Sequence, residues 1–195
     1  MPLVNSLRKE ITCKLVYYGT GLGGKTTNLQ YIYSQLAPST RGELVTLQTE
    51  TDRTLFFDFL PIDLGYIGNH KVKFAVYTVP GQVEYNSSRK MILNGADGIV
   101  FVADSDSTRA VENVESFENM LENLAANHLV IDEIPCVMQY NKRDLVTAMP
   151  IARLETELNL LRLPYFEATA TMGLGVFATM RGLSDLVLKH LAQSL

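Results

Sequence analysis

The sequence predicts a single α/β domain spanning residues 1–195, with a mixed six-stranded sheet and helices on both faces. Short runs rich in β-branched and aromatic residues alternate along the chain with helical apolar patterns, which is typical of such a domain. Two of the strand-like runs follow each other without a helix between them. They are best joined as an antiparallel hairpin, so one edge strand of an otherwise parallel sheet should be antiparallel.

The individual elements follow from the spacing of the apolar residues. The first strand should cover residues 11–18, because its near-continuous apolar character suits a central strand buried on both faces. The hairpin should pair residues 54–60 with residues 71–79 through a long linker that contains Gly65 and Gly68. Three further strands are expected at 98–104, 135–140 and 165–170, and helices at 27–36, 111–126, 151–161 and 176–191.

Composition argues against several classes of function. The chain is 47% hydrophobic and 19% charged, and its net charge of −4 disfavours a general binder of nucleic acid or anionic membranes. No apolar run approaches the roughly 20 residues that span a bilayer. Pro2 stands where myristoylation needs a glycine, and no prenylatable cysteine ends the sequence. We expect a cytoplasmic protein with no integral membrane segment and no nucleic-acid partner.

The most specific motif is a glycine-rich loop between the first strand and the first helix. Its spacing, Gly, four residues, Gly-Lys-Thr, is that of a P-loop, whose backbone N–H groups surround phosphates at the positive end of a helix. A turn that merely joins strand to helix is the alternative. The residues expected to bind nucleotide are Gly19, Thr20, Gly21, Leu22, Gly23, Gly24, Lys25, Thr26 and Thr27.

Two side chains of this loop have distinct expected roles. Lys25 should neutralise the β- and γ-phosphates and is a candidate catalytic residue. Thr26 should place its hydroxyl on Mg²⁺, which usually takes few protein ligands and completes its coordination with phosphate oxygens and water. The loop by itself does not distinguish ATP from GTP.

A second motif addresses the base. Asn141, Lys142 and Asp144 follow a predicted buried strand, at the end of the sheet where α/β folds bind ligands. Asp144 could accept hydrogen bonds from N1–H and the 2-amino group of guanine, whereas adenine lacks these donors and would leave the carboxylate unpaired. Asn141 should connect neighbouring loops, and the stem of Lys142 should lie over the base. A plain surface turn is the alternative.

The end of the last predicted strand belongs to the same site. Thr169 and Ala170 lie where a backbone N–H could meet the guanine O6. This assignment depends only on the expected position of the strand end beside the Asn141 motif.

These motifs and the segments between them resemble the small Ras-like GTPases, most closely the bacterial MglA subfamily of polarity and motility GTPases. The resemblance covers nearly the whole chain. Its most specific stretch is residues 49–61, Thr-Glu-Thr-Asp-Arg-Thr-Leu-Phe-Phe-Asp-Phe-Leu-Pro, and residues 77–83 also match. The resemblance implies a Ras-like P-loop NTPase fold, a three-layer sandwich, that binds GTP or GDP with Mg²⁺.

The resemblance also assigns roles in the two switch segments. Thr54 would close on Mg²⁺ as a second metal ligand, and Arg53 would act as an intrinsic arginine finger. Thr78 replaces an aspartate that most Ras-like proteins use to hold Mg²⁺ through water, although a hydroxyl can still hold a coordinated water. Gly81 would sense the γ-phosphate and Gln82 would orient the attacking water. A solvent-facing arginine and a solvated loop amide are the plainer interpretations of Arg53 and Gln82.

The function implied by the resemblance is a switch that slowly hydrolyses GTP to GDP and phosphate. Its expected partners are a dimeric Roadblock-type activating protein of the MglB kind, polarity and motility effectors, and an exchange factor that the sequence does not identify. A location at a cell pole in the GTP state is expected. Two alternatives stay open: a nucleotide-dependent scaffold with negligible hydrolysis, and an ATP-dependent phosphotransferase.

Overall fold

The computed structural model of the chain describes residues 2–48, 56–82 and 85–194. Within them, one eight-stranded sheet has the order β3-β4-β5-β2-β6-β7-β8, and β1 pairs with β2 beside this path. The strands are β1 Leu3–Asn5, β2 Glu10–Gly19, β3 Val45–Gln48, β4 Phe56–Ile67, β5 His70–Thr78, β6 Gly98–Asp104, β7 Cys136–Asn141 and β8 Tyr165–Glu167. The α-helices are α1 Lys25–Gln35, α2 Asn86–Leu93, α3 Ala110–Ala126, α4 Ile151–Glu157 and α5 Val176–Ser194.

The parallel centre of the sheet agrees closely with the prediction. Strands β2, β5, β6, β7 and β8 run parallel, and every residue of β6 and β7 is buried. Strands covered on both faces show this unbroken burial. Because all of these strands point the same way, their carboxyl ends gather at one edge of the sheet, where the glycine-rich loop follows β2.

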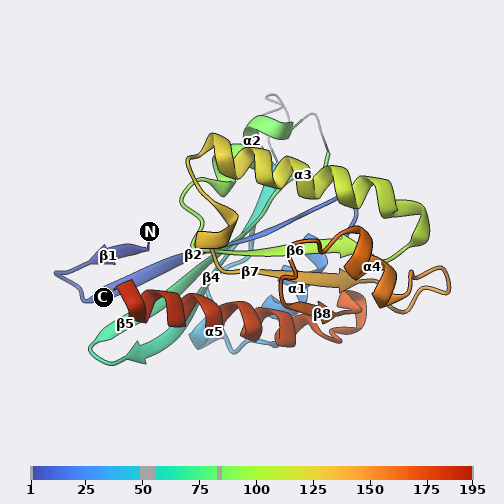
Figure 1. Cartoon of the computed structure of the whole chain (residues 1–195). Helices are drawn as coiled ribbons and strands as arrows, with labels where there is room; N and C mark the ends of the chain where they lie inside the picture. Colours follow the sequence, from blue (N-terminus) through green and yellow to red (C-terminus); the bar gives the residue numbers. More distant parts are fainter. Residues whose placement is uncertain (1, 49–55, 83–84, 195) are drawn as a thin grey trace.

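Two layers of helices cover the sheet (Figure 1). Helices α1 and α5 pack on one face, around a core that includes Leu29, Ile32 and Leu183. Helices α2, α3 and α4 pack on the other, around a core that includes Leu93 and Phe117. Successive residues of β2 enter these two cores alternately, as the twofold period of a strand requires. The three-layer α/β sandwich is thus confirmed.

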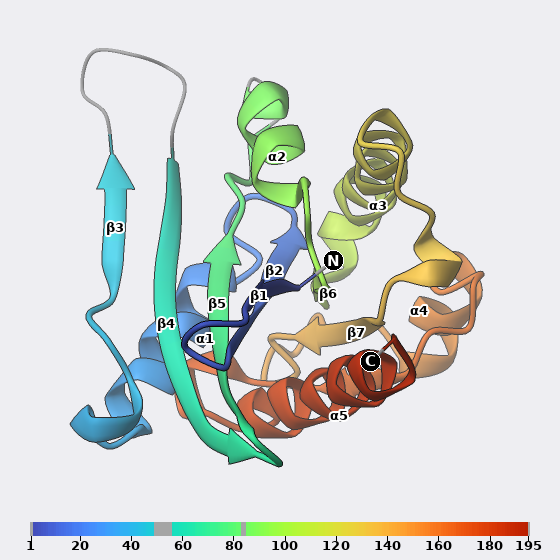
Figure 2. The same ribbon diagram turned by 90° about the vertical axis from the view of Figure 1, so that its left-hand side faces the viewer.

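The antiparallel side of the sheet differs from the prediction. The strand predicted at 54–60 is not an edge strand, because β3 pairs antiparallel with β4 and takes the outer position (Figure 2). Val45 and Leu47 of β3 are exposed, so this short strand lacks the buried, alternating pattern that would announce it. The linker predicted between the hairpin strands is also mostly strand, since β4 continues to Ile67. A β-bulge between Asp63 and Gly65 shifts the pairing register with β5.

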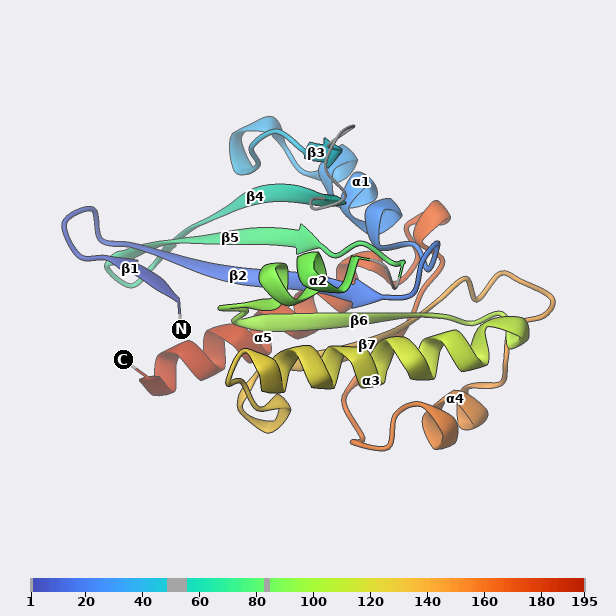
Figure 3. The ribbon, with the colours of Figure 1, turned by 90° about the horizontal axis from the view of Figure 1, so that it is seen from above.

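Other short elements were missed or misjudged in length. Strand β1 forms a hairpin with the start of β2, before β6 begins alongside Leu15, and this hairpin extends from one end of the molecule (Figure 3). Helix α2 was missed because two of its inward-facing residues, Ser88 and Arg89, are polar. Helix α4 stops at Glu157 and β8 at Glu167, earlier than the apolar pattern indicated. None of the helices in the described ranges has the length and apolar character needed to cross a membrane.

Candidate functional site

The glycine-rich loop forms a tight cradle between β2 and α1. Gly19 and Gly24 have φ angles of 140° and 100°, in a region that side chains with a Cβ rarely adopt. A Cβ on Gly19 would lie 2.1 Å from the Val102 carbonyl oxygen, and one on Gly24 would lie 2.2 Å from Nδ2 of Asn141. The loop can therefore take this shape only with glycine at both positions, which leaves its backbone open to an anion.

Lys25, the first residue of α1, is buried inside this cradle with only 6% of its surface exposed. Its Nζ donates to the carbonyl oxygens of Gly19 and Thr20, at 2.9 and 2.6 Å. Burial, helped by the positive charge of Arg89, lowers the pKa of Lys25 to about 7, and the carboxylate of Asp58 opposes this shift. A cation held by neutral carbonyls in a buried position is a good counterpart for a phosphate.

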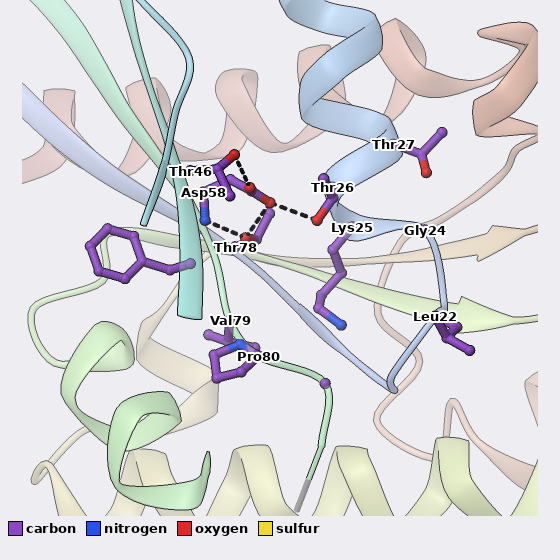
Figure 4. A pocket seen from close by; sticks show the side chains of 12 residues that line it. Leu22, Gly24, Lys25, Thr26, Thr27, Thr46, Asp58, Thr78, Val79 and Pro80 are labelled. Carbon is purple, nitrogen blue, oxygen red and sulfur yellow. Dashed lines mark hydrogen bonds between the residues drawn. The ribbon is translucent and has the colours of Figure 1, made fainter. Parts of the chain in front are cut away.

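Asp58 on β4 is a candidate functional residue to which the sequence analysis gave no role. Its side chain is 3% exposed and faces Thr26 and Thr78 (Figure 4). Asp58 Oδ2 accepts hydrogen bonds from Thr26 Oγ1 at 2.6 Å and from Thr78 Oγ1 at 2.8 Å, while Oδ1 accepts from Thr46 Oγ1 at 2.8 Å. Three threonine hydroxyls thus converge on one buried carboxylate beside the cradle.

This cluster fits a magnesium ion that is shared with phosphate. Its donors are all oxygens, which Mg²⁺ prefers, and one or two carboxylates with phosphate oxygens are its usual set. In the described part of the chain, no group of three or more His, Cys, Asp or Glu side chains could hold a metal without a phosphate. Asp58 could therefore supply, from a different strand, the carboxylate that is missing at Thr78. The sequence did contain a signal for this role, because Asp58 is an acidic residue between two phenylalanines in a strand-like apolar run.

One pocket of about 360 Å³ collects the cradle and the oxygen cluster. It is lined by Asp58 and by seven residues that the sequence predicted, namely Leu22, Gly24, Lys25, Thr26, Thr27, Thr78 and Gly81. Most of the expected phosphate and metal side of the site therefore converges in space.

The switch residues are only partly described. Gly81 lies directly against the loop, where a Cβ would be 2.2 Å from the Cα of Gly21. Gln82 is exposed beside it. Arg53 and Thr54 fall outside the described residues, so their predicted roles stay predictions.

Asn141 links the loops of the base side. Its Nδ2 donates to the Gly23 carbonyl oxygen at 2.8 Å, and its Oδ1 accepts from the Ala170 N–H at 2.9 Å. Lys142, with a φ of 65°, pairs its Nζ with Oδ2 of the buried Asp104 at 2.6 Å. These contacts hold the Asn141 motif and the strand end at 169–170 next to the phosphate cradle.

The remaining predicted base-binding groups are the Asp144 carboxylate and the amides of Thr169 and Ala170. Asp144 is exposed, so its carboxylate is solvated and the cost of leaving it unpaired arises only when a base covers it. The Thr169 N–H donates to the Leu174 carbonyl oxygen and the Ala170 N–H to Asn141. A guanine O6 at this position would have to share one of these amides, so their predicted contact stays a prediction.

Two comparisons with known proteins bear on this site. The model of the Ras family matches residues 14–189. The chain is also 53% identical over 191 residues to the Mutual gliding-motility protein MglA of Myxococcus xanthus (strain DK1622), with 98% of each chain covered. The matched span includes the cradle, the oxygen cluster and the Asn141 motif.

Proposed function

This chain belongs to the Ras family of small GTPases, and we propose that it is a Mg²⁺-dependent GTP switch of bacterial polarity and gliding motility. The observation that carries the proposal is the buried pair of opposite charges at the cradle, Lys25 and Asp58, with the Thr26 and Thr78 hydroxyls beside them. A phosphate needs the cation, and the metal that accompanies the phosphate needs the carboxylate.

The residues of the phosphate side have complementary tasks. Lys25 exchanges its two backbone carbonyl partners for β- and γ-phosphate oxygens. The Thr26 hydroxyl, which donates to Asp58 without the ion, would help to hold Mg²⁺, and Thr54 of the first switch would be a second ligand. Asp58 and Thr78 would support the ion through their carboxylate and hydroxyl oxygens. Mg²⁺ supplies positive charge that neutralises the phosphate oxygens during hydrolysis.

The residues of the base side select guanine. Asp144 accepts from the two donors that distinguish guanine from adenine, and Lys142 covers the base while its ammonium stays paired with Asp104. Asn141 keeps both sides of the site in register through its bonds to Gly23 and Ala170.

Hydrolysis uses the switch segments. Gln82 orients the attacking water, and Arg53 stabilises the charge that develops on the transferred phosphoryl group. Loss of the γ-phosphate then releases both segments, which changes the surface offered to partners. These partners are a dimeric Roadblock-type activator, an exchange factor, and effectors that place motility machinery at a cell pole. The name of the Myxococcus protein supports the motility role.

Single-turnover GTP hydrolysis, alone and with a Roadblock protein, tests the proposal. Phosphate release should be slow alone and accelerated by the Roadblock protein, while Gln82→Ala and Arg53→Ala should each slow it with nearly unchanged nucleotide affinity. Absence of phosphate release under both conditions would indicate a scaffold that binds nucleotide without hydrolysing it. Displacement of labelled GTP by excess ATP would instead favour an ATP-dependent enzyme.

A further inference from the structure

Arg89 of α2 is a buried cation that the site described above does not use. Only 2% of its surface is exposed, although α2 lies at the surface beside α3 (Figure 1). Its Nε donates to the Pro80 carbonyl oxygen at 2.8 Å, Nη2 donates to the Gly81 carbonyl oxygen, and Nη1 donates to Asn119 Oδ1 at 2.9 Å. All three acceptors are neutral, and within residues 2–48, 56–82 and 85–194 no carboxylate pairs with this buried charge to offset its desolvation.

The two carbonyl groups belong to the peptide bonds on either side of Gly81. Gly81 must lack a side chain because of its close approach to Gly21, and a glycine backbone is otherwise free to rotate. By binding both carbonyls with one rigid guanidinium, Arg89 removes this freedom. The next residue along the chain is Gln82, so the same contacts also determine where the second switch begins.

The bond to Pro80 determines the direction of the neighbouring N–H. The peptide bond between Pro80 and Gly81 is trans and planar, so its C=O and N–H point in opposite directions. The Gly81 N–H therefore points away from Arg89. The described part of the chain offers it no hydrogen-bond acceptor, and Pro80 and Gly81 both line the pocket that holds Lys25.

We propose that Arg89 is a positioning residue that presents the Gly81 N–H to the γ-phosphate. This inference rests on the proposed GTP-binding function and adds a residue to it. A charged donor on the carbonyl also polarises the peptide, which makes the N–H on its other side a stronger donor. Arg89 thus favours the triphosphate over the diphosphate without touching either.

A polar network anchors the guanidinium from the opposite side. Asn119 Oδ1, which accepts from Arg89, also accepts from Tyr18 Oη at 2.7 Å, and Asn119 Nδ2 donates to Asn86 Oδ1 at 2.9 Å. Asn123 donates to the Tyr18 hydroxyl at 3.0 Å and to Asn86 at 2.8 Å. Arg89 is thereby fixed to β2, α2 and α3 together, so it can hold Gly81 in one orientation.

The first test compares affinities for GDP and a non-hydrolysable GTP analogue in Arg89→Lys, which keeps the charge but loses the planar fork. We expect about tenfold weaker binding of the GTP analogue, the scale of one charge-assisted hydrogen bond, and unchanged GDP affinity. Arg41→Lys is the matched control, since Arg41 Nε also donates to a backbone carbonyl, that of Leu36, but away from the pocket. Asn119→Ala removes only the side-chain acceptor of Arg89 Nη1, so it should also weaken binding of the GTP analogue, but by less than Arg89→Lys.

The second test observes the Gly81 amide directly. Pro-Gly occurs only once in the sequence, at Pro80 and Gly81, so labelling proline with ¹³C at the carbonyl and glycine with ¹⁵N gives one signal from this peptide bond. The GTP analogue should move its amide proton downfield in the wild type, and by less in Arg89→Lys.

The outcomes separate the inference from the function on which it rests. If Arg89→Lys weakens the binding of both nucleotides equally, Arg89 has only a structural role. If the variant binds the GTP analogue more tightly, Arg89 stabilises the arrangement that suits the diphosphate. Unchanged affinities and an unchanged amide shift would also overturn the inference. If the wild type binds neither nucleotide, the proposed function itself fails.

Discussion

The phosphate side and the base side of the site differ in how strongly their charged groups are held by the protein. Lys25 and Asp58 are almost fully buried. The Lys25 side chain makes two hydrogen bonds to backbone carbonyls, and the Asp58 carboxylate accepts three from threonine hydroxyls. Asp144 is exposed, whereas its neighbours Asn141, Lys142 and Arg143 are tied into the fold. When nucleotide binds, Lys25 and Asp58 must give up hydrogen bonds within the protein to bind the ligand. Asp144 instead gains a partner in place of water.

This difference separates affinity from selectivity. Changes on the phosphate side should act through charge and through the cost of burying it, so they should alter affinity, metal dependence and pH dependence. A change at Asp144 should act mainly on which base is bound, because the folded protein does not depend on that side chain.

Lys25→Met tests the phosphate side with the largest expected effect. Loss of the ammonium should weaken GDP binding about 100-fold, since charge-assisted hydrogen bonds to phosphate are lost. Thermal stability should change in two opposing ways, because the variant no longer buries a cation but leaves the buried Asp58 carboxylate without that nearby positive charge. Fluorescent-GDP titration and thermal unfolding measure the two effects. Lys14→Met removes a partly buried lysine from β2 and should leave GDP affinity unchanged; a similar loss there would deny Lys25 a specific role.

Asp144→Asn tests the base side. GDP affinity should fall about 30-fold, which corresponds to roughly 2 kcal/mol for hydrogen bonds to a charged group, and unfolding should be unaffected because Asp144 is exposed. Competition of labelled GTP by GDP and by ATP measures affinity and selectivity together. Asp132→Asn, another exposed aspartate, serves as the control. Undiminished guanine selectivity in Asp144→Asn would show that other atoms recognise the base.

Asp58→Asn tests the metal role of the missed carboxylate. The amide keeps the volume but loses the charge, so the free Mg²⁺ concentration needed to slow GDP release should rise about tenfold, as for other residues that support metal sites. Release of fluorescent GDP over a series of Mg²⁺ concentrations measures it. Asp63→Asn lies on the same strand and removes only a partly exposed pair with Lys71. A Mg²⁺ requirement that is the same in Asp58→Asn and wild type would exclude the carboxylate from the metal site.

The pH dependence of binding gives the smallest effect. Burial lowers the pKa of Lys25 to about 7, so the ammonium is increasingly deprotonated above pH 7, while a bound phosphate restores the charged form. Binding then takes up a proton, and GDP affinity should fall about fivefold between pH 7 and pH 8. Calorimetry in buffers of different ionisation enthalpy measures the proton uptake. Lys25→Arg stays charged, so its GDP affinity should no longer fall with pH in this range. If the fall is the same in this variant, ionisation of the nucleotide causes it.

Motifs whose chemistry depends on a local backbone shape could be predicted from the sequence. The glycine-rich loop and the parallel strands β2, β6 and β7 carry their own signals, namely glycines at fixed spacing and unbroken apolar runs. Asn141 could be predicted as a connector because it follows such a strand, and its bonds to Gly23 and Ala170 are present.

Features that depend on long-range packing could not be predicted. Asp58 acquires its role only when β4 is placed beside β5, which brings it to Thr78, 20 residues further along the chain. Strand β3 lies at an exposed edge, and the short helix α2 turns the polar residues Ser88 and Arg89 inward, so neither offers an apolar run that predicts it. In these cases tertiary contacts, and not local preference, determine the structure.

The contacts of Asn141 bind loops from three distant parts of the chain into one cooperative unit. A single side chain connects the phosphate cradle, the end of β7 and the turn after β8, with a separation of 118 residues to Gly23. Local unfolding of any one of these loops must break bonds in another, so the amides of Gly23, Asn141 and Ala170 should exchange with solvent at a common rate.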